Sequence, residues 1–422
     1  MNHLYTRRQF LARAGVLGAL AACSGPVLQS SSLAGGKLPM AEAFDREMEQ
    51  FMSARKVPGG ALAVVKDQRL VYARAYGWAD REKKAPVKPD SLFRIASLSK
   101  PFTATAVLRL VETKGLDLET PVTEFLPLKP VLANGKTADP RWKRVTLRHC
   151  LHHTGGWDRD VSGDPMFRSL ETARAVGVPP PANAEAIIRY MLGQPLDFEP
   201  GARYAYSNFG YCLLGRVIER LGGRPYERFV REEVLAPMGI RRMRLGASLE
   251  SGRAEGEVRY YTPGDSQGPS VFPGLPAKVP EPYGTFCLEA MDSHGGWLAS
   301  APDLARFAAT LDAPADSTCL KPDTRRIFYE PPAPPVGRNP DGSLADHFYG
   351  CGWTVRPVGK EGRASYSHNG SLPGTSTLLV RGSDGLSWAV LFNQRSESSS
   401  LPDAAIAPAL RRAADAVDRW PG

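Results

Sequence analysis

Apolar residues follow two patterns along the chain, one with helical spacing and one of short β-prone runs. From residue 40 to about residue 57, apolar side chains return every three or four positions, which predicts an amphipathic helix ended by the Pro-Gly-Gly at 58–60. Residues 61–65 and 70–76 are instead short β-prone runs joined by a polar turn, and they predict a hairpin of two strands. After residue 40, the chain thus begins with a helix and two strands.

Helical spacing dominates the middle of the chain, and strands return towards its end. Helices are predicted at 97–114, 184–192, 211–221, 225–235 and 301–311. Four β-prone runs follow at 352–357, 364–368, 374–381 and 386–393, and a last helix is predicted from residue 406. Residues 158–181 show neither period and predict a surface loop.

Because strands lie at both ends of the chain and helices between them, the simplest architecture is α+β. One antiparallel sheet is expected from both chain ends, flanked by the terminal helices, with a mainly helical lobe inserted. The sheet lobe would comprise about 40–96 and 290–422, and the helical lobe about 97–289. Such an arrangement places a cleft between the lobes, where binding sites commonly lie.

The start of the apolar helix that ends before Gly115 carries the first candidate chemistry. Ser97 and Lys100 stand three residues apart there, and residues at this spacing share a helix face. The helix is apolar on all sides, so its first turn should be buried. Burial lowers the pKa of a lysine and leaves an amine able to accept the serine proton. Alone the pair is weak evidence, because Ser-x-x-Lys occurs by chance about once in such a chain.

A second candidate element is Tyr206-Ser207-Asn208, just before the helix predicted at 211–221. A buried tyrosine beside a lysine can be held partly ionised and move protons. An asparagine can orient the lysine or bind a substrate amide. The alternative interpretation is a loop tyrosine followed by a helix-capping asparagine.

A third candidate element is His-x-Gly, which occurs three times, beginning at His153, His294 and His368. Only His368 ends a predicted strand that another strand follows, and we select it for that reason. An adjacent strand edge would place the backbone N–H of Ser371 beside that of Ser97. Two such donors can stabilise an oxyanion.

The amino terminus has the pattern of an export signal. A twin-arginine motif at 6–11 precedes the apolar stretch 14–22, which is too short to span a hydrocarbon core of about 30 Å. The Leu-Ala-Ala-Cys that ends at Cys23 resembles a lipoprotein cleavage site, with a lipid on the sulfur. The alternative is ordinary cleavage nearby, with Cys23 removed or unmodified. The predicted organisation is a signal peptide at 1–22, a Ser/Gly-rich tether at 23–39 and one domain at 40–422.

Composition argues against several function classes. The formal net charge is +9 over 422 residues, without a basic run longer than a pair, so nothing indicates a nucleic-acid partner. The six cysteines are scattered and predict neither a disulfide framework nor a zinc site. His-Glu-x-x-His is absent from the sequence, and we expect no metal and no cofactor.

In this order and spacing, the three elements resemble the motifs of serine hydrolases of the class C β-lactamase and penicillin-binding-protein-like superfamily. Further matches lie at 92–97, 148–156, 200–204 and 295–305, so the resemblance covers roughly residues 40–395. The fold it implies is the α+β architecture expected above. The resemblance implies Ser97 as nucleophile, assisted by Lys100 and by Tyr206 as base and later acid. The substrate-binding residues that it implies are Asn208, His368, Gly370 and Ser371.

His368 departs from the pattern, since serine β-lactamases carry a lysine at this place. A histidine is largely neutral at pH 7, so a fixed cation for a substrate carboxylate would be missing. Arg259, from the Gly- and Pro-rich segment 253–286, is the candidate that could replace it.

The resulting hypothesis is an exported serine hydrolase that forms an acyl-enzyme on Ser97. Its expected substrates are esters or amides, either small molecules or D-amino-acid peptides. One alternative is a DD-peptidase or β-lactamase acting on penicillin-like substrates. Another is an inactive binding or sensor module, against which the intact catalytic residues argue. The expected location is the periplasm, or its membrane through a lipid on Cys23.

Overall fold

The computed structural model describes residues 39–132, 137–311, 320–359, 363–395 and 405–421. The chain divides into one unit at Met1–Lys37 and a second at Leu38–Gly422, and the fold described here is that of the second. The predicted signal peptide, almost all of the tether and Cys23 lie outside the described residues. Among the helices that the structure describes, none has both the length and the apolar character of a membrane span.

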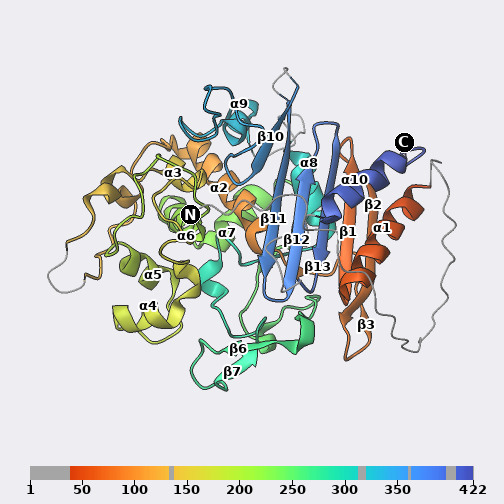
Figure 1. The fold of residues 1–422 in the computed structure, drawn as a ribbon, viewed down its shortest axis with the longest axis horizontal. Helices are drawn as coiled ribbons and strands as arrows, with labels where there is room; N and C mark the ends of the chain where they lie inside the picture. The colour runs from red at the N-terminus through yellow and green to blue at the C-terminus, as the bar shows by residue number, and fades with distance from the viewer. Residues whose placement is uncertain (1–38, 133–136, 312–319, 360–362, 396–404, 422) are drawn as a thin grey trace, which may run out of the picture. The chain divides into compact units, whose positions relative to one another are not determined.

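An eight-stranded antiparallel sheet forms the centre of the second unit (Figure 1). Its strands, in spatial order, are β3 (Ala85–Pro86), β2 (Arg69–Asp80), β1 (Gly59–Lys66), β13 (Leu386–Phe392), β12 (Thr375–Arg381), β11 (Arg363–Leu372), β10 (Thr354–Val358) and β9 (Phe348–Tyr349). At its middle β1 pairs with β13, from Gly60 opposite Phe392 to Lys66 opposite Leu386. The two ends of the chain therefore build one sheet, which confirms the expected α+β architecture.

Two terminal helices cover one face of this sheet. α1 (Met40–Arg55) and α10 (Ile406–Ala416) lie side by side against it (Figure 1). The helices bury their apolar stripes there: Phe51 stacks on Phe392 of β13, with ring centroids 5.0 Å apart. This core is built from both ends of the chain, as the helical spacing predicted.

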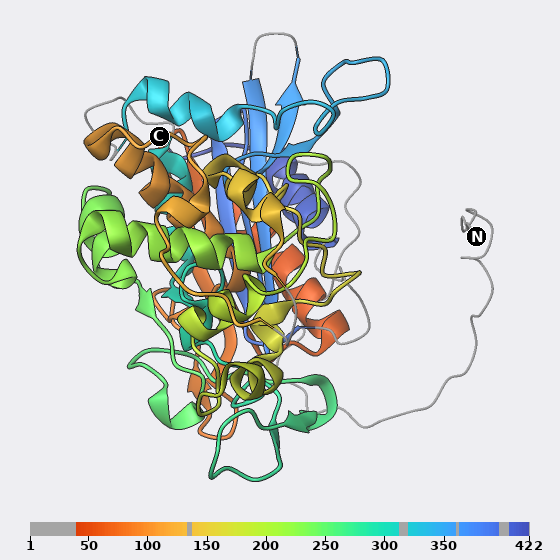
Figure 2. The ribbon, with the colours of Figure 1, turned by 90° about the vertical axis from the view of Figure 1, so that its left-hand side faces the viewer.

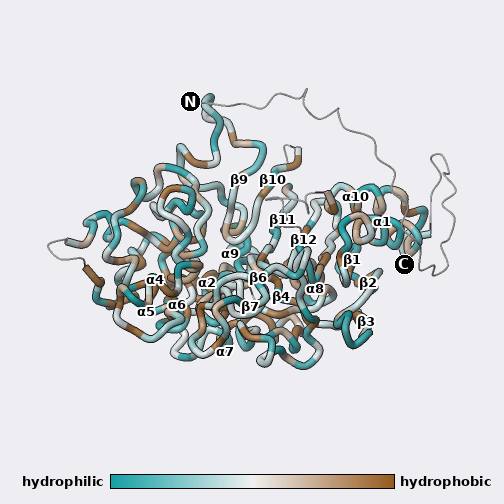
Figure 3. The backbone as a smooth tube through the Cα atoms, turned by 60° about the horizontal axis from the view of Figure 1, so that its bottom comes forward, coloured by the Kyte–Doolittle hydropathy of each residue, from teal (hydrophilic) through white to brown (hydrophobic). Residues whose placement is uncertain are grey.

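The other face carries α8 (Ala301–Thr310) and the helical lobe, which Figure 2 shows in front of the sheet. The lobe is built around α2 (Ser99–Lys114), whose first ten residues are all buried. In Figure 3 hydrophobic and hydrophilic stretches alternate along the other helices of the lobe, as expected for helices with one buried side. These helices are α3 (Leu147–Leu151), α4 (Ser169–Val176), α5 (Ala184–Met191), α6 (Asn208–Gly222) and α7 (Tyr226–Val230).

Short strands complete the structure around the lobe. β4 (Phe93–Arg94), β8 (Trp297–Ala299) and β5 (Arg244–Leu245) form a three-stranded sheet. β6 (Gln267–Pro269) pairs with β7 (Lys278–Pro280), and α9 (Pro322–Arg326) lies beside α2. Because β4 leads directly into α2, the small sheet fixes where that helix begins.

Two details differ from the sequence-based expectations. The predicted loop at 158–181 contains the two-turn helix α4, which is too short for its periodicity to stand out. β11 does not end at His368 but continues to Leu372, and Gly370 pairs with Thr377 of β12. Asn-Gly-Ser is a sequence typical of turns, and pairing with β12 overrides that local preference.

Candidate active site

Ser97 lies in a strained turn between β4 and α2. The turn is a 3₁₀ helix at Ala96–Leu98, and Ala96 has φ +48°, a conformation that costs most non-glycine residues about 1–3 kcal/mol. The preceding residue, Ile95, is held on both sides. Its N–H donates to the carbonyl of Trp297 at 2.9 Å, and its carbonyl accepts from Thr377 Oγ1 at 3.0 Å. The surrounding strands therefore hold the turn that presents Ser97.

Lys100 is completely buried one helical turn beyond Ser97. Its Nζ lies 3.0 Å from Ser97 Oγ, 2.8 Å from Asn208 Oδ1 and 3.0 Å from the carbonyl oxygen of His294. Burial lowers the Lys100 pKa well below its usual value, and Arg159 lowers it further, whereas the Asp164 carboxylate acts in the opposite direction. The predicted contact between Ser97 and a low-pKa lysine is thus present.

The orientation of Asn208 determines which way the Lys100 lone pair points. Its Nδ2 donates to the Asp164 carboxylate at 2.6 Å, so its Oδ1 must face Lys100. Asn208 Oδ1 and the His294 carbonyl only accept hydrogen bonds, so they take the two hydrogens of a neutral amine. The remaining lone pair faces the hydroxyl of Ser97. This arrangement suits an amine that accepts the serine proton.

Tyr206 approaches Ser97 from the other side. Its hydroxyl donates to Ser97 Oγ at 2.9 Å, so the structure brings together the two residues to which the resemblance gave a joint role. Burial raises the Tyr206 pKa, and the hydrogen bond with Ser97 offsets only part of this rise. The expectation of a partly ionised tyrosine is therefore wrong for the free protein. The phenol keeps its proton, and the available lone pair is that of Lys100.

His368 lies on β11 and is buried. Its Nδ1 is 2.6 Å from the carbonyl oxygen of Asn369, which can only accept, so Nδ1 carries the proton. Its Nε2 is 2.9 Å from the hydroxyl of Tyr349 and accepts from it. Burial, helped by the nearby Lys100, lowers the pKa of His368 to about 3. The histidine is neutral, and no cation stands where serine β-lactamases carry a lysine.

Gly370 brings β11 up to the turn that carries Ser97. A Cβ added there would lie 2.3 Å from the Ile95 carbonyl oxygen and 3.2 Å from the Ala96 Cβ. Only glycine permits this approach. This close approach explains why position 370 of the strand holds glycine and not alanine.

An open pocket of about 530 Å³ lies over Ser97. The residues that line it are Ser97, Asp158, Arg159, Asp160, Arg203, Tyr204, Ala205, Tyr206, Asn369 and Ser371. The volume falls in the range of small-molecule sites. Ser97 and Ser371 both line this pocket. The pair of oxyanion donors expected from their backbone N–H groups stays a prediction.

The other two His-x-Gly motifs also reach this site, although the sequence analysis set them aside. The carbonyl of His294 accepts from Lys100. The ring of His153 lies 4.3 Å, centroid to centroid, from the rings of both Tyr206 and Tyr349, and its Nδ1 accepts from the backbone N–H of Ser207. The repeated motif was the available signal, and it marked three parts of one site.

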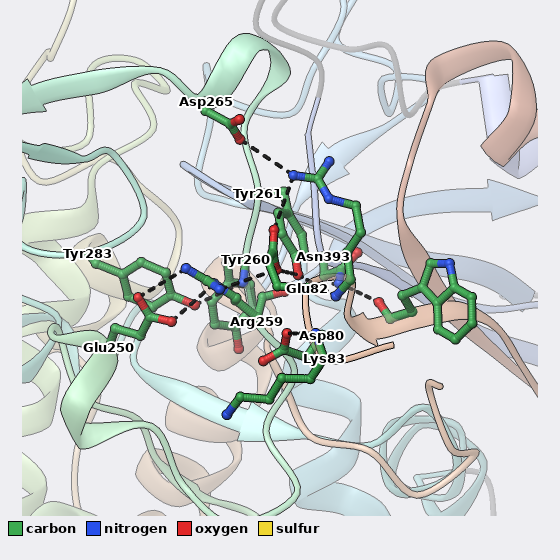
Figure 4. A network of polar contacts seen from close by, with 12 residues as sticks. Asp80, Glu82, Lys83, Glu250, Arg259, Tyr260, Tyr261, Asp265, Tyr283 and Asn393 are labelled. Atoms are coloured by element: carbon green, nitrogen blue, oxygen red, sulfur yellow. Dashed lines mark hydrogen bonds and ion pairs between the residues drawn. The ribbon is translucent and has the colours of Figure 1, made fainter. Parts of the chain in front are cut away.

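Arg259 does not supply the missing cation. Figure 4 shows Arg259 in a polar network, where it pairs with Glu82 at 3.2 Å and with Glu250 at 3.0 Å. It is not among the residues that line the pocket. The arginines that do line the pocket are Arg159 and Arg203. Both lie in the helical lobe. Arg203 falls within the matched segment 200–204, whereas the segment that carries Arg159 shows no motif.

The described residues form neither a metal centre nor an α/β-hydrolase nucleophile. Within the described ranges, no group of three or more His, Cys, Asp or Glu residues could hold a metal ion. The sequence contains one Gly-x-Ser-x-Gly, at 264–268, the pattern of α/β-hydrolase nucleophiles. Its Ser266 belongs to a turn before β6 and donates to the Pro263 carbonyl. The strand-to-helix turn which that chemistry requires is therefore not formed there.

A serine in contact with a buried lysine and a tyrosine, beside a sheet built from both chain ends, defines a serine hydrolase of the β-lactamase type. The comparison with protein families agrees: the chain belongs to the Beta-lactamase family, whose profile matches residues 44–412.

Several relatives are similar over much of the chain. Penicillin-binding protein 4* of Bacillus subtilis is 28% identical over 82% of this chain and 70% of its own length. Esterase EstB of Burkholderia gladioli is 32% identical over 58% of this chain and 60% of its own. Among solved structures, D-amino acid amidase of Ochrobactrum anthropi superposes with a TM-score of 0.65 at 23% identity, covering 89% of this chain and 98% of that one. The amidase supports the fold.

Proposed function

We propose that this hydrolase cleaves ester or amide bonds of small molecules or D-amino-acid peptides through an acyl-enzyme on Ser97. The observation that carries the proposal is the environment of Lys100. Two acceptors occupy the hydrogens of its amine, and its lone pair faces the Ser97 hydroxyl at 3.0 Å. An ester substrate is favoured by the similarity to esterase EstB.

In the acylation step, Lys100 takes the proton of Ser97 while Oγ attacks the substrate carbonyl carbon. The backbone N–H groups of Ser97 and Ser371 would receive the oxyanion. As the intermediate collapses, the bond to the leaving group breaks and the leaving atom takes the Tyr206 proton. The Lys100 ammonium then returns a proton to the Tyr206 phenolate, since both side chains meet at Ser97 Oγ, at 3.0 and 2.9 Å. Water then attacks the acyl group with the same residues acting in reverse.

A β-lactam or D-alanyl peptide substrate is the second candidate. It is favoured by the similarity to penicillin-binding protein 4*. It is disfavoured by the neutral His368, because such substrates carry a carboxylate and no fixed cation stands at that place. A sensor module without activity is disfavoured by the complete set of contacts around Ser97.

Activity profiling of the purified protein separates these candidates. Short p-nitrophenyl esters, nitrocefin and D-alanyl peptides are offered to the wild type and to Ser97→Ala. The proposal predicts turnover of the esters that Ser97→Ala loses, with slower turnover of nitrocefin. Preferential turnover of nitrocefin would instead identify a β-lactamase. Ester turnover equal in both proteins would contradict a role for Ser97.

We also propose export by the twin-arginine route and a lipid on Cys23. The twin-arginine motif at 6–11 and the Leu-Ala-Ala-Cys before the tether support this. Metabolic labelling with a radioactive fatty acid should mark the wild type and not Cys23→Ala. Replacing Arg7 and Arg8 by lysine should leave the precursor in the cytoplasm. Export that is unchanged by the lysine pair would contradict the route.

A further inference from the structure

Three cationic side chains lie close to Ser97, and they differ in how their charge is balanced. Lys100 is enclosed, and burial favours its neutral form. Arg203 forms an ion pair with Asp158 at 2.6 Å. Arg159 pairs with no carboxylate among the residues that the structure describes. Arg159 is therefore the cation in the pocket lining whose charge is available to a ligand.

The guanidinium of Arg159 is directed towards the reaction centre. Its Cζ lies 5.0 Å from the centroid of the Tyr206 ring, and the hydroxyl of that ring contacts Ser97 Oγ. A cation over a tyrosine face is attracted by the ring. The contact leaves the N–H donors at the edge of the guanidinium free for a planar anion.

The loop that carries Arg159 is anchored by its neighbours. The N–H of Asp158 donates to Asp197 Oδ2 at 2.7 Å, and Ser162 Oγ donates to the same oxygen at 2.9 Å. The carbonyl of Arg159 itself accepts from the N–H of Gly163 at 3.1 Å. The guanidinium thus extends from a backbone held on both sides of it, which lowers the entropy cost of binding.

We propose that Arg159 binds a carboxylate of the substrate, so that the preferred substrates are esters or amides of acids that carry a second carboxylate. This inference rests on the proposed function and specifies its substrate class. A guanidinium matches a carboxylate through two parallel hydrogen bonds, which a lysine cannot form. Arg159 belongs to the helical lobe, whereas His368, which replaces a lysine, belongs to β11.

Two features limit the size of the effect. Asp160 lines the same pocket and repels an anion. Arg159 is exposed, so salt screens its charge, with a Debye length of about 8 Å at physiological ionic strength. We therefore expect roughly a tenfold preference, about 1.4 kcal/mol.

The test uses two substrates that differ in one charge, the mono-p-nitrophenyl ester of glutaric acid and its methyl ester. For each protein the readout is the ratio of kcat/KM for the acid to kcat/KM for the methyl ester. This ratio cancels effects of Arg159 on the reaction itself, including its influence on the Lys100 pKa. Arg159→Gln should lower the ratio about tenfold, and Arg159→Lys should restore part of it. Added NaCl should lower the wild-type ratio and leave that of Arg159→Gln unchanged.

Two further arginines serve as controls. Arg259→Gln removes a cation that is paired outside the pocket and should leave the ratio unchanged. Arg395 donates to Ser371 Oγ at 3.3 Å on the β11 side and is the rival cation. A ratio that survives Arg159→Gln, or that falls only in Arg395→Gln, overturns the inference. Its failure is distinct from that of the proposed function, in which the methyl ester too would show no Ser97-dependent turnover.

Discussion

The two sides of the active site, called here the interior wall and the loop wall, differ in the charge states of their basic side chains. On the interior wall, which lies behind the residues that line the pocket, Lys100 and His368 are buried, and burial favours the neutral form of each. On the loop wall, Arg159 is exposed and keeps a charge that no described carboxylate pairs. The difference arises because burial removes water and disfavours a charged side chain on the interior wall, whereas water stabilises the charged side chain on the loop wall. Proton transfer is thus assigned to the interior wall and substrate selection to the loop wall.

Removing the amine from the interior wall should have the largest effect. Lys100→Met keeps the length of the side chain and removes the group that accepts the Ser97 proton. We expect kcat/KM for a neutral p-nitrophenyl ester to fall by about 10⁴ or more, the scale seen when a catalytic base is lost. Steady-state kinetics measure this. A loss below tenfold would place the base elsewhere.

The next effect compares two aromatic residues of the same site. Tyr206→Phe removes a proton donor 2.9 Å from Ser97 Oγ and should cost about 10²–10⁴ in kcat. His368→Ala should cost less, because the hydrogen bonds of His368 go to Tyr349 and to the carbonyl of Asn369. The two variants are compared on one neutral ester. A larger loss in His368→Ala would show that the roles are reversed.

A smaller effect is expected on the pH dependence of kcat/KM when Asp164 is replaced. Lys100 must be neutral to act, so kcat/KM holds at a plateau above its lowered pKa and falls as the pH drops through that value. The Asp164 carboxylate raises the Lys100 pKa. Asp164→Asn should therefore move the acid limb of the profile to lower pH, with about tenfold loss of rate as Asn208 loses its fixed orientation.

Asp160→Asn is the matched control for this measurement. Asp160 belongs to the same loop and is not among the groups that shift the Lys100 pKa. The acid limb should stay in place in this variant. An equal shift in both variants would mean that the overall negative charge of the loop, and not Asp164 in particular, raises the Lys100 pKa.

The close approach of β11 to the turn that carries Ser97 should affect the stability of the protein, with a smaller effect than the changes above. Gly370→Ala would place a Cβ 2.3 Å from the Ile95 carbonyl oxygen, which should lower the free energy of unfolding by about 1–3 kcal/mol. Gly295→Ala is the control, since the nearest atom to its added Cβ is 3.8 Å away. Chemical denaturation measures both variants. Equal stability of the two would contradict the close approach of β11.

Local patterns in the sequence were enough to predict the sheet and the interior wall. The helical spacing of α1 and the short apolar runs of β1 and β13 are patterns of neighbouring residues in the chain, and so are the motifs at Ser97 and Tyr206. The loop wall could not be predicted in this way. Arg159 and Asp164 act through contacts with Tyr206 and Asn208, more than forty residues away, and no local period or motif announces such contacts.

The extent of β11 shows the same limit. Asn369-Gly370-Ser371 has the composition of a turn, but pairing with β12 extends the strand through it. The three His-x-Gly motifs also looked like competitors in the sequence. The structure brings all three together, because α3, β8 and β11 meet around Lys100 and Tyr206.

The central claim is that Ser97 becomes acylated because a neutral Lys100 accepts its proton. Intact-mass analysis after treatment with a fluorophosphonate tests this most directly. The wild type should gain the mass of one adduct, Lys100→Met should gain it far more slowly, and Ser97→Ala should gain none. An unlabelled wild type, or an equal adduct on Ser97→Ala, would contradict the account.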